Sequence, residues 1–133
     1  MSAVTIKSSV KVAGGILKRC SHSSISTKSS MNFSVFLPPS TTGSVGPVPA
    51  MFWLSGLTCT DENFVSKASN AFTAAAKANI AIVMPDTSPR ENKVKGDDKD
   101  WDFGTGASFY GTCHSEVSFR SATYPYFKPS FST

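Results

Sequence analysis

The sequence predicts an α/β fold in which antiparallel strands lead into a β-α-β unit. Two short apolar runs, residues 48–54 and 80–84, flank a helical segment over residues 63–79 that is rich in alanine. A wholly apolar strand that follows a helix is typical of a parallel sheet covered on both faces. Upstream of these runs, apolar and polar residues alternate, which predicts strands with one buried face.

Three leading strands are predicted between residues 3 and 37. Residues 3–12 alternate apolar and polar side chains, and a Gly14-Gly15 turn connects them to a second strand over residues 16–22. This pattern predicts a β-hairpin. Residues 31–37 alternate in the same way and stop at two prolines, which predicts a third strand. Polar and glycine-rich composition predicts loops over residues 23–30 and 41–48.

The stretch after the third strand organises the rest of the chain. Residues 48–54 are bulky and apolar, so we expect a buried strand that breaks at Ser55-Gly56. Gly56 tolerates backbone angles that a side chain would forbid, and Asp61-Glu62 favours a helix start. A strand, a glycine turn and a helix leave backbone N–H groups free to hold an anion or a developing negative oxygen. An ordinary strand-to-helix loop is the alternative.

Composition limits the classes of function. The chain has 133 residues and a net charge of +4, which suits one modest globular domain. The cations of residues 1–60 are spread singly among serines, so we expect solvated strand faces and no nucleic-acid partner. No apolar run approaches the ~20 residues that a membrane helix needs, so we expect no membrane partner. The serine-rich, acid-free start also resembles a transit peptide, but the hairpin pattern favours a folded segment and a cytoplasmic location.

Cysteines and histidines indicate no metal site. Three cysteines at unrelated spacings fit neither a disulfide framework nor a zinc pattern: Cys20, Cys59 and Cys113. Their number and spacing suit a reducing compartment. Thiol–imidazole pairs with His22 or His114 are conceivable, but nothing in the spacing supports them.

A polar loop over residues 86–100 follows the 80–84 strand, at the sheet edge where ligands bind in open α/β folds. Residues 101–110, W-D-F-G-T-G-A-S-F-Y, close this loop with aromatic residues and two glycines. They form either an aromatic-anchored surface loop or one wall of an active-site cleft.

Together these segments resemble the S-formylglutathione hydrolase (esterase D) family. The motifs that carry the resemblance are G-G-I-L-K-R near residue 15, M-N-F-S-V-F-L-P-P at 31–39, W-L-S-G-L-T-C-T-D-E-N-F at 53–64, P-D-T-S-P-R at 85–90 and the 101–110 segment. Glu91 and Ser108 depart from the pattern, because the family favours glycine at both positions. The resemblance implies an α/β-hydrolase fold, with residues 1–110 as a truncated N-terminal portion of a mainly parallel sheet with antiparallel leading strands. Residues 111–133 do not resemble the family and read as a divergent, irregular tail.

The resemblance implies a serine thioesterase that hydrolyses S-formylglutathione to glutathione and formate in formaldehyde detoxification. It also implies a carboxylesterase side activity, no cofactor and a small-molecule thioester as partner. By this resemblance the Leu57 backbone N–H is an oxyanion donor and Gly56 makes its turn. Cys59, Trp101 and Phe103 are then candidates to line the pocket. The alternative for Cys59 is that it is a small residue that packs in the interior and has no role in the site.

The family's nucleophile elbow, G-x-S-x-G, does not occur in these 133 residues. We therefore expect no Ser-Asp-His triad in this chain and no triad-dependent hydrolysis by the chain alone. The alternative is a non-catalytic fragment or interaction protein that pairs with a full-length homologue through an open sheet edge. A homodimer is a further possibility that the sequence does not decide.

Overall fold

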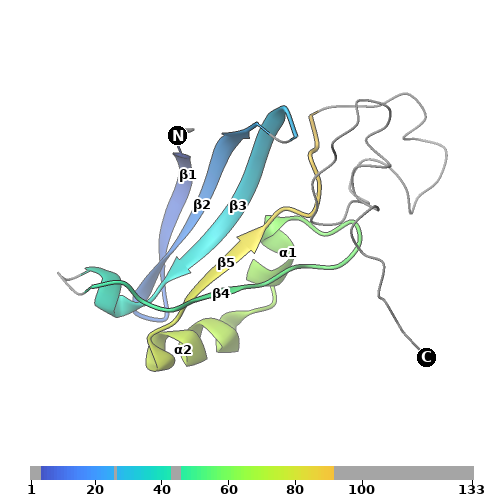
Figure 1. Cartoon of the computed structure of the whole chain (residues 1–133). Helices are drawn as coiled ribbons and strands as arrows, with labels where there is room; N and C mark the ends of the chain where they lie inside the picture. Colours follow the sequence, from blue (N-terminus) through green and yellow to red (C-terminus); the bar gives the residue numbers. More distant parts are fainter. Residues whose placement is uncertain (1–3, 26, 43–45, 92–133) are drawn as a thin grey trace, which may run out of the picture.

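The strands form one mixed sheet in the order β1-β2-β3-β5-β4 (Figure 1). The computed structural model describes residues 4–25, 27–42 and 46–91. Neighbouring strands are antiparallel except for the parallel pair β4 and β5. The elements are β1 (Val4–Val12), β2 (Gly15–Ser24), β3 (Ser29–Leu37), the 3₁₀ helix η1 (Pro39–Thr42), β4 (Ala50–Phe52), α1 (Asp61–Val65), α2 (Ser69–Ala78) and β5 (Ala81–Pro85).

The β-hairpin of β1 and β2 is confirmed, but its turn lies one residue earlier than predicted. The buried face expected for its first strand is not observed, because β1 lies at the edge of the sheet and residues 4–11 are all exposed. Ala13 and Gly14 both have positive φ, 49° and 78°, which is the requirement of a two-residue type I′ turn. Gly15 is already the first residue of β2, paired with Val12. A Cβ at Gly15 would lie 2.3 Å from the Leu37 carbonyl oxygen, so close approach of the backbones explains this glycine.

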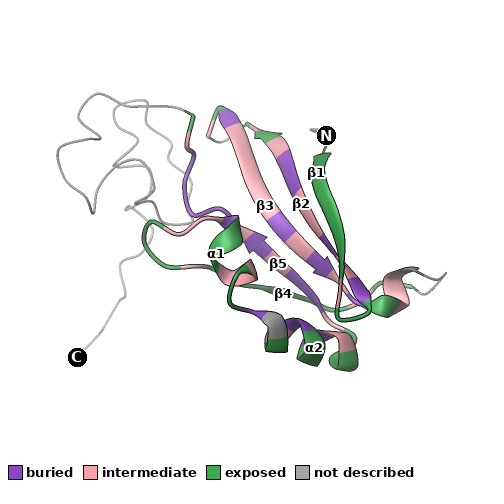
Figure 2. Ribbon diagram, turned by 180° about the vertical axis from the view of Figure 1, so that it is seen from behind, coloured by how far each residue is buried: buried purple, intermediate pink, exposed green. Residues whose placement is uncertain are grey.

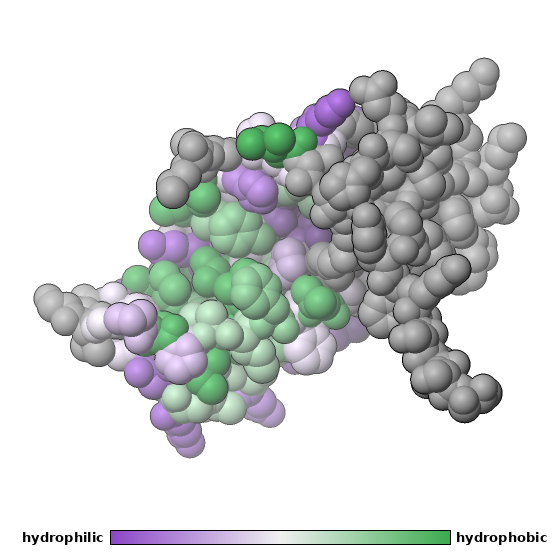
Figure 3. Space-filling view, viewed as in Figure 1, coloured by the Kyte–Doolittle hydropathy of each residue, from purple (hydrophilic) through white to green (hydrophobic). Residues whose placement is uncertain are grey.

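The expectation that residues 48–54 form a buried strand is wrong. β4 spans Ala50–Phe52, and each of its residues is exposed. In the described sheet β4 lies at the edge and pairs with β5 alone, so nothing there covers its outer side. The exposed fractions of Met51 and Phe52 are 47% and 65%, and apolar side chains gather on this side of the molecule (Figure 3).

The helical segment is divided into two helices instead of the single helix expected over residues 63–79. The Lys67 N–H donates to the Phe64 carbonyl, three residues back, and the Ser66 hydroxyl donates to the Asn63 carbonyl. Both bonds tighten and close the last turn of α1. α2 ends at Ala78, and the left-handed backbone of its C-cap Asn79 lets the Ile80 N–H donate to the Ala75 carbonyl at 3.0 Å.

Both helices lie on one side of the sheet, the side turned to the reader in Figure 2. The core forms between them and the sheet. Its buried members are Leu17, Phe36, Ala68, Phe72, Ala75, Ile82 and Met84. The Phe36 and Phe72 rings, from β3 and α2, lie 5.1 Å apart. This packing holds α2 against the sheet.

The division at residue 110 lies outside the described residues, so it stays a prediction. In the part of the chain that the structure describes, no helix has the length and hydrophobicity that crossing a membrane requires.

Candidate active site

The loop after β4 contains a tight turn over residues 56–59. The Cys59 N–H donates to the Gly56 carbonyl at 3.1 Å, which closes the turn. Thr58, at its third position, has φ of 64°. That sign at the third position is typical of a type II turn, in which glycine is the usual residue. A β-branched residue in this region costs about 1–3 kcal/mol and needs other contacts to hold it.

The expectation that Gly56 supplies the unusual backbone angle is wrong. Among the described glycines only Gly14 has positive φ. A Cβ at Gly56 would meet nothing within 4 Å. Neither conformation nor packing therefore requires glycine at this position, and the left-handed residue of the turn is Thr58.

The Leu57 backbone N–H lies at the second position of the 56–59 turn, outside the strand ladder. It has no protein acceptor among the described residues. The residue itself is 38% exposed. This N–H is therefore able to donate to an acceptor that the described part of the chain does not supply.

Arg90 and its neighbours hold the carbonyl side of the turn. The Arg90 Nη2 donates to the Cys59 carbonyl at 2.9 Å and to the Thr58 carbonyl at 3.3 Å. The Thr87 hydroxyl also donates to the Cys59 carbonyl. Arg90 in turn makes an ion pair of 2.9 Å with Asp86, which is buried at the end of β5.

A second buried ion pair fixes the helix that follows the turn. The Asp61 carboxylate is fully buried and accepts from Arg19 Nε at 2.9 Å, Arg19 Nη2 at 3.1 Å and the Ser34 hydroxyl at 3.0 Å. Arg19 Nη1 also pairs with Glu62 at 2.8 Å. The hydrogen bond to Asp61 raises the pKa of the Arg19 guanidinium, against the lowering effect of burial. The pair ties β2 to the first turn of α1.

The start of α1 is confirmed at Asp61, where the sequence predicts it. Thr60 is the N-cap, and its hydroxyl accepts from the Glu62 N–H at 3.2 Å while Asn63 Oδ1 accepts from the Thr60 N–H at 2.7 Å. This is a capping box. The cap and the Arg19–Asp61 pair together fix the exit of the 56–59 turn.

Aromatic packing fixes the entrance of the same loop. The Trp53 N–H donates to the Val83 carbonyl at 2.8 Å, which extends the parallel pairing one residue beyond β4. The Trp53 ring lies 4.3 Å from the Phe64 ring of α1. The loop is therefore held to β5 and to α1 before the turn begins.

Sequence reasoning missed Arg19, Asp61 and Arg90 as residues that support the site. The one available signal for Arg19 was its place between Leu17 and Ser21, on the strand positions that face the helices. Of the predicted pocket residues, Cys59 lies in the 56–59 turn and is half-buried. Trp101 and Phe103 lie outside the described residues.

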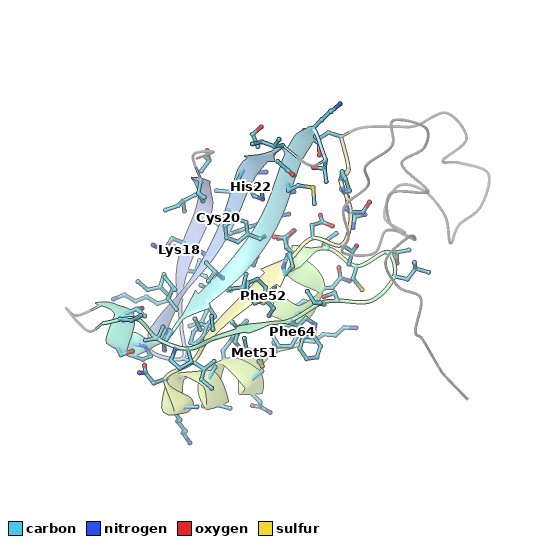
Figure 4. All side chains as sticks on the ribbon, viewed as in Figure 1. Lys18, Cys20, His22, Met51, Phe52 and Phe64 are labelled. Atoms are coloured by element: carbon cyan, nitrogen blue, oxygen red, sulfur yellow. The ribbon has the colours of Figure 1, made fainter. Side chains whose placement is uncertain are left out.

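Cys20 is the other cysteine that the structure describes, and it is buried in β2 (Figure 4). Burial raises the pKa of its thiol above the ordinary 9.0, while the charge of Lys18 opposes this shift. Within the described ranges, no group of three or more His, Cys, Asp or Glu residues is arranged so that it could hold a metal ion.

The buried thiol predicts a loss of stability at alkaline pH. Above about pH 9 the unfolded chain releases the Cys20 proton before the folded chain does, so the folded state then binds more protons. The free energy of unfolding should therefore fall as pH rises from 8 through this window, and fall less in C20A. Urea unfolding at pH 8 and pH 10 measures both slopes. Equal slopes for the two proteins would contradict this assignment.

The Esterase family model matches residues 24–125. The chain is 50% identical over 103 residues to S-formylglutathione hydrolase of Mus musculus, covering 77% of this chain and 36% of that protein. It is 50% identical over 102 residues to the Arabidopsis thaliana protein of the same name, covering 77% of this chain and 35% of that one. The chain thus spans about a third of the length of these relatives.

A solved structure gives the same fold. The S-formylglutathione hydrolase from Agrobacterium tumefaciens superimposes with a TM-score of 0.77 and 36% sequence identity. The match covers 94% of this chain and 44% of that chain. The predicted α/β-hydrolase fold, as an N-terminal portion, is confirmed by this superposition.

Proposed function

Because the chain belongs to the esterase family, we propose that it supplies the oxyanion-binding part of a serine thioesterase acting on S-formylglutathione. The observation that carries the proposal is the Leu57 N–H, which has no acceptor among the described residues and lies in a turn fixed on both sides. The relatives named S-formylglutathione hydrolase support the substrate class.

In this proposal the Leu57 N–H donates to the thioester carbonyl oxygen as a serine attacks the carbonyl carbon. Negative charge then develops on that oxygen, and a fixed donor stabilises it more than it stabilises the ground state. The second donor in this fold follows the nucleophile. The 133 residues hold no G-x-S-x-G elbow, so the proposal takes the serine from polypeptide other than these residues.

The remaining parts of the proposal follow the family. Cys59 lies in the turn and would line the pocket, with Trp101 and Phe103 as further walls. Hydrolysis yields glutathione and formate, which places the reaction in formaldehyde catabolism, with the cytoplasm as its location. Residues 1–110 would belong to the hydrolase domain.

A chimera tests the proposal. The matched 103 residues replace the corresponding segment of the mouse relative, which contributes the rest of a complete hydrolase. We expect the chimera to hydrolyse S-formylglutathione and p-nitrophenyl acetate, and a serine-directed fluorophosphonate to abolish turnover. The 133-residue chain assayed alone is expected to show no such turnover. A chimera that folds, as judged by circular dichroism, but stays inactive would overturn the proposal.

A further inference from the structure

Arg90 contacts the 56–59 turn from a segment that is distant in the sequence. Its guanidinium donates to the carbonyls of Thr58 and Cys59, the two residues that follow Leu57. Both carbonyls belong to the turn, and one belongs to the residue with positive φ. Because the Cys59 N–H closes the turn onto the Gly56 carbonyl, a contact that holds Thr58 and Cys59 also holds the Leu57 N–H within the same closed turn.

The position of Arg90 is itself fixed by a buried partner. Its Nε donates to the two Asp86 oxygens at 3.2 and 3.1 Å, and its Nη2 donates to Oδ1 at 2.9 Å. Asp86 is 3% exposed. The Asp86 N–H donates to the Asn32 carbonyl of β3 at 3.0 Å, and the Ser88 N–H donates to the Asp86 carboxylate at 3.3 Å. The guanidinium is thus anchored through Asp86, the residue that follows β5, which is itself hydrogen-bonded to β3.

The chemistry of the contact suits arginine and not lysine. A planar guanidinium can hold a carboxylate with two parallel bonds while a further N–H points to a carbonyl. An ammonium group at the same place keeps the charge next to Asp86 but has no fixed fork. The left-handed Thr58 needs such outside support, because the conformation is unfavourable for a β-branched residue.

We propose that Arg90 is a positioning residue that holds Thr58 in the left-handed conformation and thereby aims the Leu57 N–H at the substrate oxygen. The orientation of the Leu57 N–H toward a substrate rests on the proposed function. The effect of Arg90 on the Thr58 backbone does not. In the complete enzyme Arg90 acts through the backbone of the turn and touches no reacting atom.

Nuclear magnetic resonance of the 133-residue chain tests the hold on Thr58. In wild type, the three-bond coupling constant between the amide and α protons of Thr58, together with its chemical shifts, should report positive φ. R90K keeps a cation beside Asp86 and should lose this signature, with shifted amides at residues 57–59. The second variant, D86N/R90Q, leaves no unpaired buried charge and should lose it too. T58G/R90K should restore the Leu57 amide position, since glycine adopts positive φ without support. K77Q, on the exposed side of α2, is the matched control.

Kinetics of the chimera test the consequence for catalysis. R90K should lower kcat by up to ~10²-fold with KM unchanged, because a misplaced donor is lost in the transition state. T58G/R90K should recover most of the loss, which a merely destabilising role of Arg90 would not allow. A Thr58 that keeps positive φ in both R90K and D86N/R90Q overturns the proposal. An inactive wild-type chimera overturns the proposed function. The magnetic resonance experiment then still tests whether Arg90 holds Thr58 at positive φ.

Discussion

Replacing Leu57 with proline in the chimera is expected to lower kcat for S-formylglutathione by ~10²–10³-fold, the usual loss for one oxyanion donor. Proline removes the backbone N–H and changes little else here. Leu57 occupies the second position of the 56–59 turn, where proline is favoured because its ring presets φ. The variant is therefore close to a pure deletion of the donor.

L57A is the matched control, since it shortens the side chain and keeps the N–H. We expect L57A to retain kcat within about threefold, because loss of a partly exposed side chain leaves the transition-state hydrogen bond in place. Circular dichroism and the thermal midpoint of both variants report whether the turn is preserved. Equal kcat values for L57P and L57A, with both variants folded, would remove Leu57 from the oxyanion hole.

Replacing Arg19 with methionine is expected to lower the free energy of unfolding by about 3 kcal/mol. The change leaves the Asp61 carboxylate fully buried with the Ser34 hydroxyl as its remaining side-chain donor. The value belongs at the lower end of the range for broken buried pairs, because the Arg19 side chain is 32% exposed and water screens part of the interaction. Urea unfolding of the 133-residue chain at pH 7 measures the change.

The double variant R19M/D61N separates two contributions to the loss of stability: the unpaired buried charge of Asp61 and the lost packing of the Arg19 side chain. Asparagine removes the unpaired buried charge, so we expect the double variant to be more stable than R19M alone. K67M, at an exposed position just after α1, is the control and should change stability by less than about 0.5 kcal/mol. If R19M matches wild type, the Arg19–Asp61 pair does not stabilise the start of α1.

The positions of the strands could be predicted from the sequence, because side-chain period is typical of a strand. The same period did not predict burial in β1, where residues 4–11 are all exposed. The same reasoning failed for β4: its composition is that of a covered strand, but exposure depends on neighbours that local sequence does not describe. The break between α1 and α2 was also missed, since the hydrogen bonds that close the end of α1, from the Lys67 N–H and the Ser66 hydroxyl, have no signature in composition.

The 56–59 turn is a second feature that could not be predicted from the local sequence. Composition favours Gly56 as the unusual residue, yet Thr58 adopts the left-handed conformation, at a place where Arg90 and Thr87 donate to the Thr58 and Cys59 carbonyls. Arg90 lies 31 residues from Cys59, and Arg19 lies 42 residues from Asp61. Contacts over such separations follow from the folded topology and have no signature in a local pattern.

These separations also imply an order of assembly. The β1–β2 hairpin closes through a two-residue turn, so its loop-closure entropy is small and it can form early. The 56–59 turn acquires its Arg90 support only once β5 has docked beside β3. Changes at Arg90 should therefore speed unfolding and leave the folding rate nearly constant.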